Sequence, residues 1–224
     1  MCGRFVVAKA VGEILTIFEA DEIVGDVPGI SYNVAPTQPI AIVVDRSFEK
    51  APDGSPIGEL HREIHAARWG LIPRWAKDAT GAPLINGRIE SILEKPSFKD
   101  SVVRRRCVIP ASGYYEWQVK PDGTKQPYYI NAGNDGVFAL AGLYEWWRDP
   151  SKPEGDPARW LLSATTLTKA SAPELAHIHD RNPVLLTPES LEAWIDPHIE
   201  GDQDLLDAVA GESDVVASEA EIGR

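Results

Sequence analysis

Short apolar runs alternate with polar turn segments along most of the chain. The runs are rich in β-branched or aromatic residues and lie at 40–44, 65–71, 107–110, 114–119, 127–131, 137–143, 160–166 and 183–186. Turn signals such as Pro121-Asp122-Gly123 join several of them, and residues 46–63, where prolines alternate with glycines, are typical of a hairpin. Runs of this length favour antiparallel strands. We therefore predict a mainly antiparallel sheet that curls into a barrel-like core.

Helical patterns are fewer than strand patterns. Four apolar side chains from Val11 to Phe18 share one stripe, as expected of a short helix that packs on the core. Thr187 followed by Pro188 is a favourable helix start, with the threonine as N-cap. In all, the patterns predict helices at 9–20, 88–95, 188–195 and 203–210. The predicted fold class is therefore α+β, with a few peripheral helices.

The length of the chain suits one domain. It has 224 residues, 43% of them apolar, which is enough for a sizeable core. The most loop-like interior segment, at 148–157, is interpreted as a surface loop and not as a linker between domains. We predict a single domain over residues 1–224, and a monomer.

Targeting signals and metal-ligand clusters do not stand out in the sequence. Nowhere do about 18 apolar residues follow one another, and no signal-peptide pattern is found, so we expect a cytoplasmic protein without a membrane partner. The two cysteines, Cys2 and Cys107, are too few for a disulfide framework. His177 and His179 have one further weak ligand in sight, so we expect no metal and no cofactor. Cys107 is predicted to be a buried strand thiol.

Charge is distributed unevenly along the chain. The net charge is -12, which by itself argues against nucleic acid, because phosphate binding depends on clustered lysine and arginine. However, residues 121–224 hold 19 of the 34 acidic groups, whereas residues 68–106 hold nine basic groups against four acidic ones. Such a local excess is often merely solvated, but it also leaves room for a basic strip.

Cys2 follows the initiator methionine directly, and its small side chain allows that methionine to be removed. Removal leaves an α-amine and a thiol on one residue, with ordinary pKa values near ~8 and ~8.5. The amine of such a pair attacks an aldehyde to give an imine, which the thiol closes to a thiazolidine. Alternatively, the thiolate attacks an acyl group, as in N-terminal-nucleophile hydrolases. Position alone leaves an accidental cysteine open as well.

Three further segments carry side chains suited to acid–base chemistry, each of them weak evidence by itself. Asn86 and Arg88 face the same side of an extended backbone, and Gly87 between them permits close approach of another backbone. Glu116 lies in a strand-like run among aromatic residues, and partly apolar surroundings suit a carboxyl group for general-acid chemistry. His179, beside an acid and an arginine, suits proton transfer near neutral pH.

Six segments resemble, in order, the motifs of the SOS response-associated peptidase (SRAP) family. They are Met-Cys-Gly-Arg-Phe at 1–5, Tyr-Asn-Val-Ala-Pro at 32–36, Trp-Gly-Leu-Ile-Pro at 69–73, Asn-Gly-Arg-Ile-Glu at 86–90, Gly-Tyr-Tyr-Glu-Trp at 113–117 and Ile-His-Asp-Arg-Asn-Pro at 178–183. The resemblance runs from residue 1 to about 195. Six motifs in the same order leave little room for chance.

The resemblance implies an enzyme that binds single-stranded DNA and forms a covalent thiazolidine crosslink with abasic sites, shielding them from cleavage. It also implies autocatalytic removal of Met1, association with the nucleoid during DNA repair, and replication-fork proteins as partners. Carried over by motif, the catalytic residues are Cys2, Asn86, Glu116 and His179. The DNA-binding residues are Arg4, Asn33, Arg74, Trp75, Arg88 and Arg181, and we expect the basic strip to include Arg68, Lys77 and Arg104–Arg106 as well.

Two departures from the family pattern bear on these expectations. Relatives often show two adjacent aromatic residues where this chain has Trp75 followed by Ala76. The aromatic wedge that stacks on a base is therefore expected to be narrower. Relatives typically continue with a polar terminal strand, whereas this sequence stops at Arg224, which leaves that strand in doubt.

Two other functions remain open at the level of sequence. One is a dedicated N-terminal-nucleophile hydrolase that acts on peptides or amides in trans. The other is a noncatalytic single-strand-binding module in which Cys2 is incidental.

Overall fold

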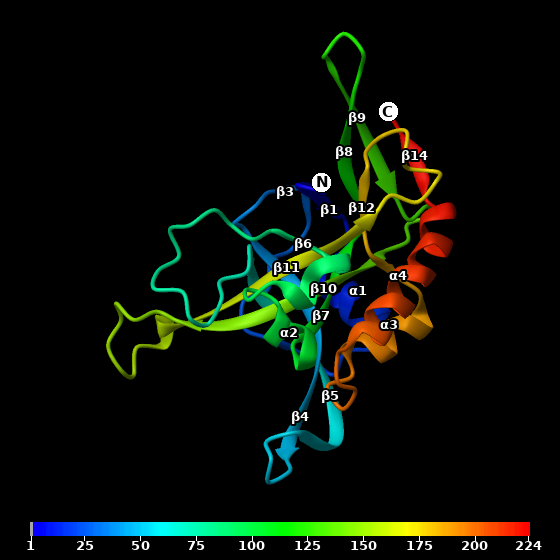
Figure 1. The fold of residues 1–224 in the computed structure, drawn as a ribbon. Coiled ribbons are helices and arrows are strands. Elements are labelled where there is room, and N and C mark those ends of the chain that lie inside the picture. Colours follow the sequence, from blue (N-terminus) through cyan, green and yellow to red (C-terminus); the bar gives the residue numbers. More distant parts are fainter. Residues whose placement is uncertain (1) are drawn as a thin grey trace.

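The computed structural model describes residues 2–224, and its strands form two sheets around one hydrophobic core (Figure 1). The strands are β1 (Arg4–Val7), β2 (Glu22–Val24), β3 (Ser31–Val34), β4 (Pro39–Lys50), β5 (Pro56–Trp69), β6 (Asn86–Arg88), β7 (Arg106–Ala111), β8 (Gly113–Val119), β9 (Lys125–Asn131), β10 (Phe138–Arg148), β11 (Trp160–Ala170), β12 (Arg181–Pro183), β13 (Leu185–Leu186) and β14 (Glu221–Gly223). The helices are α1 (Val11–Ile17), α2 (Lys99–Arg104), α3 (Pro188–Ile195) and α4 (Gln203–Ser218), with short 3-10 helices η1 (Ile89–Glu94) and η2 (Pro157–Arg159).

The larger sheet closes on itself. Its strands follow the order β12-β11-β10-β7-β4-β5-β2, and two parallel pairs between β5 and β11, Arg68 with Ser163 and Trp69 with Ala164, complete a ring. The smaller sheet has the order β14-β9-β8-β1-β3, and all of its pairings are antiparallel. The predicted α+β class with a barrel-like, mainly antiparallel core is confirmed.

The strands at the centre of the ring are buried on both faces and carry mostly apolar side chains. All six residues of β7 are buried, as are Ile40 to Asp45 of β4. Strands covered on both faces are expected to form continuous apolar runs. Cys107, the second residue of β7, is fully buried, as predicted for a strand thiol.

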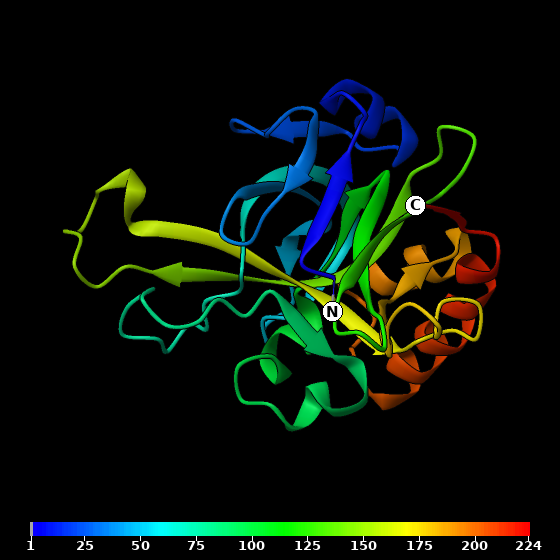
Figure 2. The ribbon, with the colours of Figure 1, turned by 90° about the horizontal axis from the view of Figure 1, so that it is seen from above.

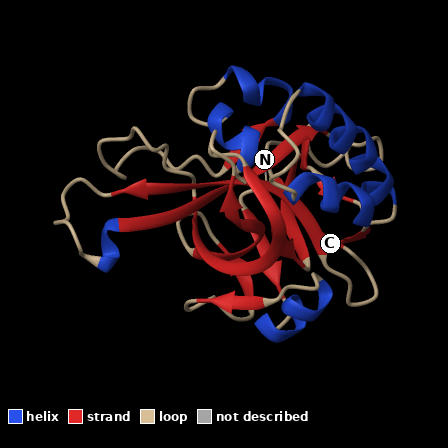
Figure 3. Ribbon diagram, turned by 90° about the horizontal axis from the view of Figure 1, so that it is seen from below, coloured by secondary structure: helices blue, strands red, loops and turns tan. Residues whose placement is uncertain are grey.

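Helices lie at the periphery of the curved strands (Figure 3). Three hairpins extend outward: β4–β5 and β10–β11 from the ring, and β8–β9 from the smaller sheet (Figures 1 and 2). β1 runs between β3 and β8 in the smaller sheet (Figure 2). Among residues 2–224, no helix is long and apolar enough to cross a bilayer.

Some predicted elements differ from those observed. The helix predicted at 88–95 instead begins as β6, because Asn86–Arg88 pair in parallel with β11, and it continues as the 3-10 helix η1. Helix α2, at Lys99–Arg104, was not predicted, because only two of its residues are buried and they leave no periodic signal. At the end of the chain β14 pairs with β9, so a short terminal strand is present where the sequence left one in doubt.

Arg106 is a structural residue and does not belong to the predicted basic strip. Its guanidinium group is buried and donates at 2.6–2.8 Å to five backbone carbonyl oxygens near the ends of α2 and α3, namely those of Val102, Val103, Trp194, Asp196 and Ile199. Carbonyl groups at helix ends have no partner inside the helix. Burial lowers the pKa of Arg106 to about 10, so the group stays charged at neutral pH and serves as a shared cap.

Arg106→Met is therefore expected to lower the free energy of unfolding by about 3–5 kcal/mol, because five buried carbonyl groups lose a charged donor. Chemical denaturation measures the change. Arg148→Met, which alters an exposed arginine on β10, is the control and is expected to stay within about 0.5 kcal/mol. A similar small effect of both substitutions would show that Arg106 does not hold the helix ends.

Candidate active site

Cys2 is buried just before β1, with 1% of its surface exposed. Its carbonyl oxygen accepts a hydrogen bond of 2.9 Å from Asn86 Nδ2, and its Sγ lies 3.8 Å from the carbonyl oxygen of Arg4. Burial, and after it the negative charge of Glu116, raises the pKa of the Cys2 thiol to about 12. At neutral pH the thiol is therefore protonated. Met1 lies outside the described residues, and with it the peptide bond that the predicted autopeptidase activity would break.

Asn86 reaches Cys2 from the larger sheet. It begins β6, where it pairs with Thr166 of β11, and the extended backbone predicted for Asn86–Arg88 is confirmed. Asn86 Oδ1 is buried and has no hydrogen-bond partner among residues 2–224. A Cβ atom on Gly87 would lie 2.5 Å from Ile92 Cδ1, so this glycine allows tight packing inside the protein. The backbone of β11 runs beside Gly87, which pairs with Leu167.

Glu116 comes from β8, the strand that pairs with β1. Arg4 lies opposite Tyr115 in this pairing, so Glu116 is one residue beyond the paired segment. The carboxyl group is buried, and its Oε1 accepts the backbone N–H of Trp117 at 3.3 Å. Tyr114 shares its face of the strand, and the pKa of its phenol is raised by burial and by the charges of Cys2 and Glu116. Tyr114 was not among the predicted site residues, although it lies two residues before Glu116 in the same motif.

His179 lies in the segment between β11 and β12. Its Nε2 is 4.0 Å from Glu116 Oε1, while its Nδ1 accepts the backbone N–H of Arg181 at 3.0 Å. Asp180 Oδ1 is 2.8 Å from the same Nδ1, which would call for the opposite tautomer. We assign the proton to Nε2, because the backbone amide of Arg181 is fixed, whereas the Asp180 side chain is 84% exposed. With this tautomer the imidazole presents its N–H at Nε2, 4.0 Å from Glu116 Oε1.

A hollow of about 400 Å³ opens beside two of these groups. It is lined by Glu116, Trp117, Val119, Lys125 and His179. Asn86 contacts the backbone of Cys2, the charge of Glu116 acts on the Cys2 thiol, and His179 lies 4.0 Å from Glu116, so a thiol, an amide, a carboxyl group and an imidazole come together from four separate segments of the chain. Such a set can carry out nucleophilic attack assisted by proton transfer.

Most of the residues predicted to bind DNA are accessible. Asn33, Arg74, Trp75 and Arg88 are exposed and Arg4 is half-buried, with its Nη1 donating to the carbonyl oxygen of Gly3 at 2.8 Å. Trp75 is 66% exposed, on the segment that joins β5 to β6. This segment is held against β10 by a hydrogen bond of 2.8 Å from Trp147 Nε1 to the carbonyl oxygen of Ala76.

Arg181 is an exception to this accessibility. Its guanidinium group makes two bonds of 2.8 Å to the carboxylate of Glu90 and one of 2.7 Å to the carbonyl oxygen of Thr168, and its side chain is 12% exposed. The guanidinium group thus joins β12 to β11 and to η1, and the contact of Arg181 with phosphate stays a prediction.

Other parts of the predicted basic strip are also engaged inside the protein. Arg105 pairs with the buried Glu145 at 2.8 Å, Arg104 donates to the carbonyl oxygen of Pro197, and Arg68 donates to that of Gly70.

Tyr32, beside Asn33 on β3, is 65% exposed and was not predicted as a site residue. Exposed aromatic side chains can stack on unpaired bases. The position of this tyrosine next to the motif asparagine was the feature of the sequence that could have identified it.

Within residues 2–224, no three histidine, cysteine, aspartate or glutamate side chains gather in a group that could hold a metal ion.

Comparisons with known proteins identify the family of this chain. A model of the family described as SOS response associated peptidase (SRAP) matches residues 1–220. The abasic site processing protein YoqW of Bacillus subtilis is 39% identical over 199 residues, which are 88% of this chain and 81% of that protein. The abasic site processing protein HMCES of Rattus norvegicus is 33% identical and is matched over 53% of its length.

Solved structures share the fold. The crystal structure of a protein from Bacteroides thetaiotaomicron is similar with a TM-score of 0.75 at 21% identity, and the similarity covers 99% of this chain and 90% of that one. A phage-related protein from Bordetella bronchiseptica is similar with a TM-score of 0.63 at 23% identity. With the family model matching almost the whole sequence, the chain belongs to the SOS response associated peptidase (SRAP) family.

Proposed function

We propose that this protein binds single-stranded DNA and forms a covalent thiazolidine crosslink with abasic sites through Cys2, after removal of Met1. The observation that carries the proposal is the convergence of Cys2, Asn86, Glu116 and His179 from four segments distant in sequence. The relatives named as abasic site processing proteins support the same substrate.

The order of the covalent steps follows from the state of the thiol. Because the pKa of the Cys2 thiol is about 12, the free α-amine is the better nucleophile for the first attack. The amine nitrogen bonds to the aldehyde carbon of the ring-opened sugar, and loss of one water gives an imine. The thiol then adds across the C=N bond: sulfur bonds to carbon, and the thiol proton passes to nitrogen. The product is a five-membered thiazolidine.

Glu116 and His179 supply the proton transfers. An abasic deoxyribose reacts as its open-chain aldehyde, and opening moves a proton from the hydroxyl group to the ring oxygen. We assign Glu116 to this opening, since it lies against the nucleophile, and His179 to imine formation and its reversal. Asn86 holds the Cys2 backbone and orients the open-chain hydroxyl group with its unpaired Oδ1. A neutral amide does this without protonating the amine.

The DNA strand is proposed to follow the exposed residues around the site. Arg4, Arg74 and Arg88 hold phosphates, Asn33 lines the site, and Trp75 stacks on a base, a contact worth roughly 1–3 kcal/mol. Arg88 makes no hydrogen bond or ion pair within the described chain and is exposed, so its charge is available. Autocatalytic removal of Met1 is part of the proposal, because the reactive amine exists only after that cleavage.

Mature wild-type protein, mixed with a single-stranded oligonucleotide that carries one abasic site, is expected to give a shifted band on a denaturing gel. Cys2→Ala is expected to abolish the shifted band, since an imine without the thiol stays reversible. Cys107→Ala, which removes the other buried thiol, should retain it and serves as the control. Binding without a shift would favour a noncatalytic module, and turnover of peptides without an adduct would favour a hydrolase.

Glu116→Gln is expected to slow crosslink formation by roughly 10²-fold, whereas His179→Ala should slow imine formation and the release of the DNA by a similar factor. Single-turnover formation rates and release rates from the purified crosslink measure the two effects separately. If Glu116→Gln slowed release of the DNA as strongly as crosslink formation, the assignment of separate roles would be refuted.

A further inference from the structure

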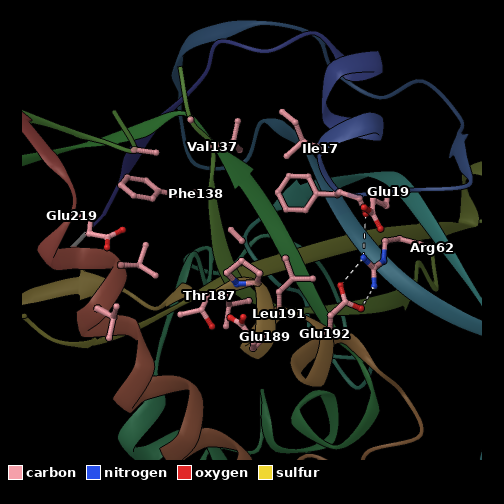
Figure 4. A pocket seen from close by; sticks show the side chains of 18 residues that line it. Ile17, Glu19, Arg62, Val137, Phe138, Thr187, Glu189, Leu191, Glu192 and Glu219 are labelled. Carbon is pink, nitrogen blue, oxygen red and sulfur yellow. Dashed lines mark hydrogen bonds and ion pairs between the residues drawn. The ribbon is translucent and has the colours of Figure 1, made fainter. Parts of the chain in front are cut away.

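A second hollow, apart from the one beside His179, lies away from the candidate active site. It has a volume of about 660 Å³ and lies where the end of α1, the start of β10, the start of α3 and the end of α4 meet (Figure 4). None of the predicted catalytic or DNA-binding residues lines it, and it shares no residue with the hollow beside His179. We refer to it as the α1/α4 groove.

The floor and walls of the groove are apolar. Ile17, Phe18, Val137, Phe138, Leu191 and Val216 contribute to them. The apolar surface continues past the rim, because Ile17 is 47% exposed and Val215 is 58% exposed. An apolar surface that extends beyond one cavity suits a stretch of chain better than a single small molecule.

Carboxyl groups surround this apolar surface. Glu19, Glu189, Glu192 and Glu219 all line the groove; Glu19 and Glu192 lie on the side opposite Glu219 in Figure 4. The only cation among its lining residues, Arg62, is already bound to Glu192 and to Asp45 by hydrogen bonds of 2.7–3.1 Å. The rim is therefore negative, and it repels phosphate backbones and anionic lipids.

Glu19 adds a local observation to the rim. Its φ angle of 51° lies in the left-handed region, directly after the C-cap of α1, a position where glycine is favoured. A glutamate in this conformation places a charge at the groove at some conformational cost.

We propose that the α1/α4 groove binds a segment of a partner protein in which an apolar side chain is flanked by lysine or arginine. The apolar residue would enter between Phe138 and Leu191, while its basic neighbours would meet the rim carboxylates. The charge complementarity selects a cationic protein segment over nucleic acid, so the surface would act independently of DNA capture.

The test uses the full ¹⁵N-labelled protein and short capped synthetic peptides. A peptide that alternates lysine with leucine is expected to shift the amide signals of Val137, Leu191 and Val216 in a saturable way. Replacement of the leucines by serine, or of the lysines by glutamate, is expected to weaken binding at least about tenfold. No saturable shift with the first peptide, or equal binding of any two peptides, would overturn the proposal.

Two matched double substitutions separate the groove from overall charge. Val215→Lys with Glu219→Lys changes the rim, whereas Glu22→Lys with Ile23→Lys makes the same change of charge at two exposed residues of β2. The first pair is expected to weaken peptide binding about tenfold or more, and the second to leave it within about twofold. Equal weakening by both pairs would mean that the net charge, and not the groove, attracts the peptide. DNA crosslinking by the groove variant should be unchanged, so this outcome is separate from that of the proposed function.

Discussion

The hydrogen bond from Asn86 to the carbonyl oxygen of Cys2 joins the two sheets of the fold at the start of the chain. β1 belongs to the smaller sheet, whereas Asn86 is attached to the larger ring through β11. Chain ends are usually poorly ordered unless they are tied down. Here the strand pairings of β1 on both edges and the amide of Asn86 fix the second residue beside Glu116. The precision needed for chemistry at an end of a chain thus comes from sheet architecture.

Burial of the site shapes its reactivity. The thiol of Cys2 is held in its neutral form, next to a buried carboxyl group and an imidazole that presents its N–H at Nε2, 4.0 Å from that carboxyl group. Such a thiol is a slow nucleophile toward adventitious electrophiles, since the thiolate is the reactive form. A reaction that begins at the α-amine, and uses the thiol only to close the ring, matches this electrostatic setting better than attack by a free thiolate.

The sequence predicted the fold class and most of the strands, because apolar periodicity reports local structure directly. The sequence predicts less where pairing with a distant strand determines the local structure. Residues 88–95 form part of a strand and a 3-10 helix because β11 pairs with Asn86–Arg88. The prediction treated Arg106 and Arg181 as free cations. The sequence does not reveal that Arg106 binds carbonyl groups at helix ends and that Arg181 binds Glu90. The α1/α4 groove, built from four elements distant in the chain, left no local signal.

The most direct measurement of the central claim is the intact mass of the protein before and after mixing with a single strand that carries one abasic site. The account predicts a starting mass without Met1, and then a product heavier by the mass of the strand less one water. A protein that retains Met1 in nearly every molecule, or whose mass stays unchanged in the presence of the abasic strand, would contradict it.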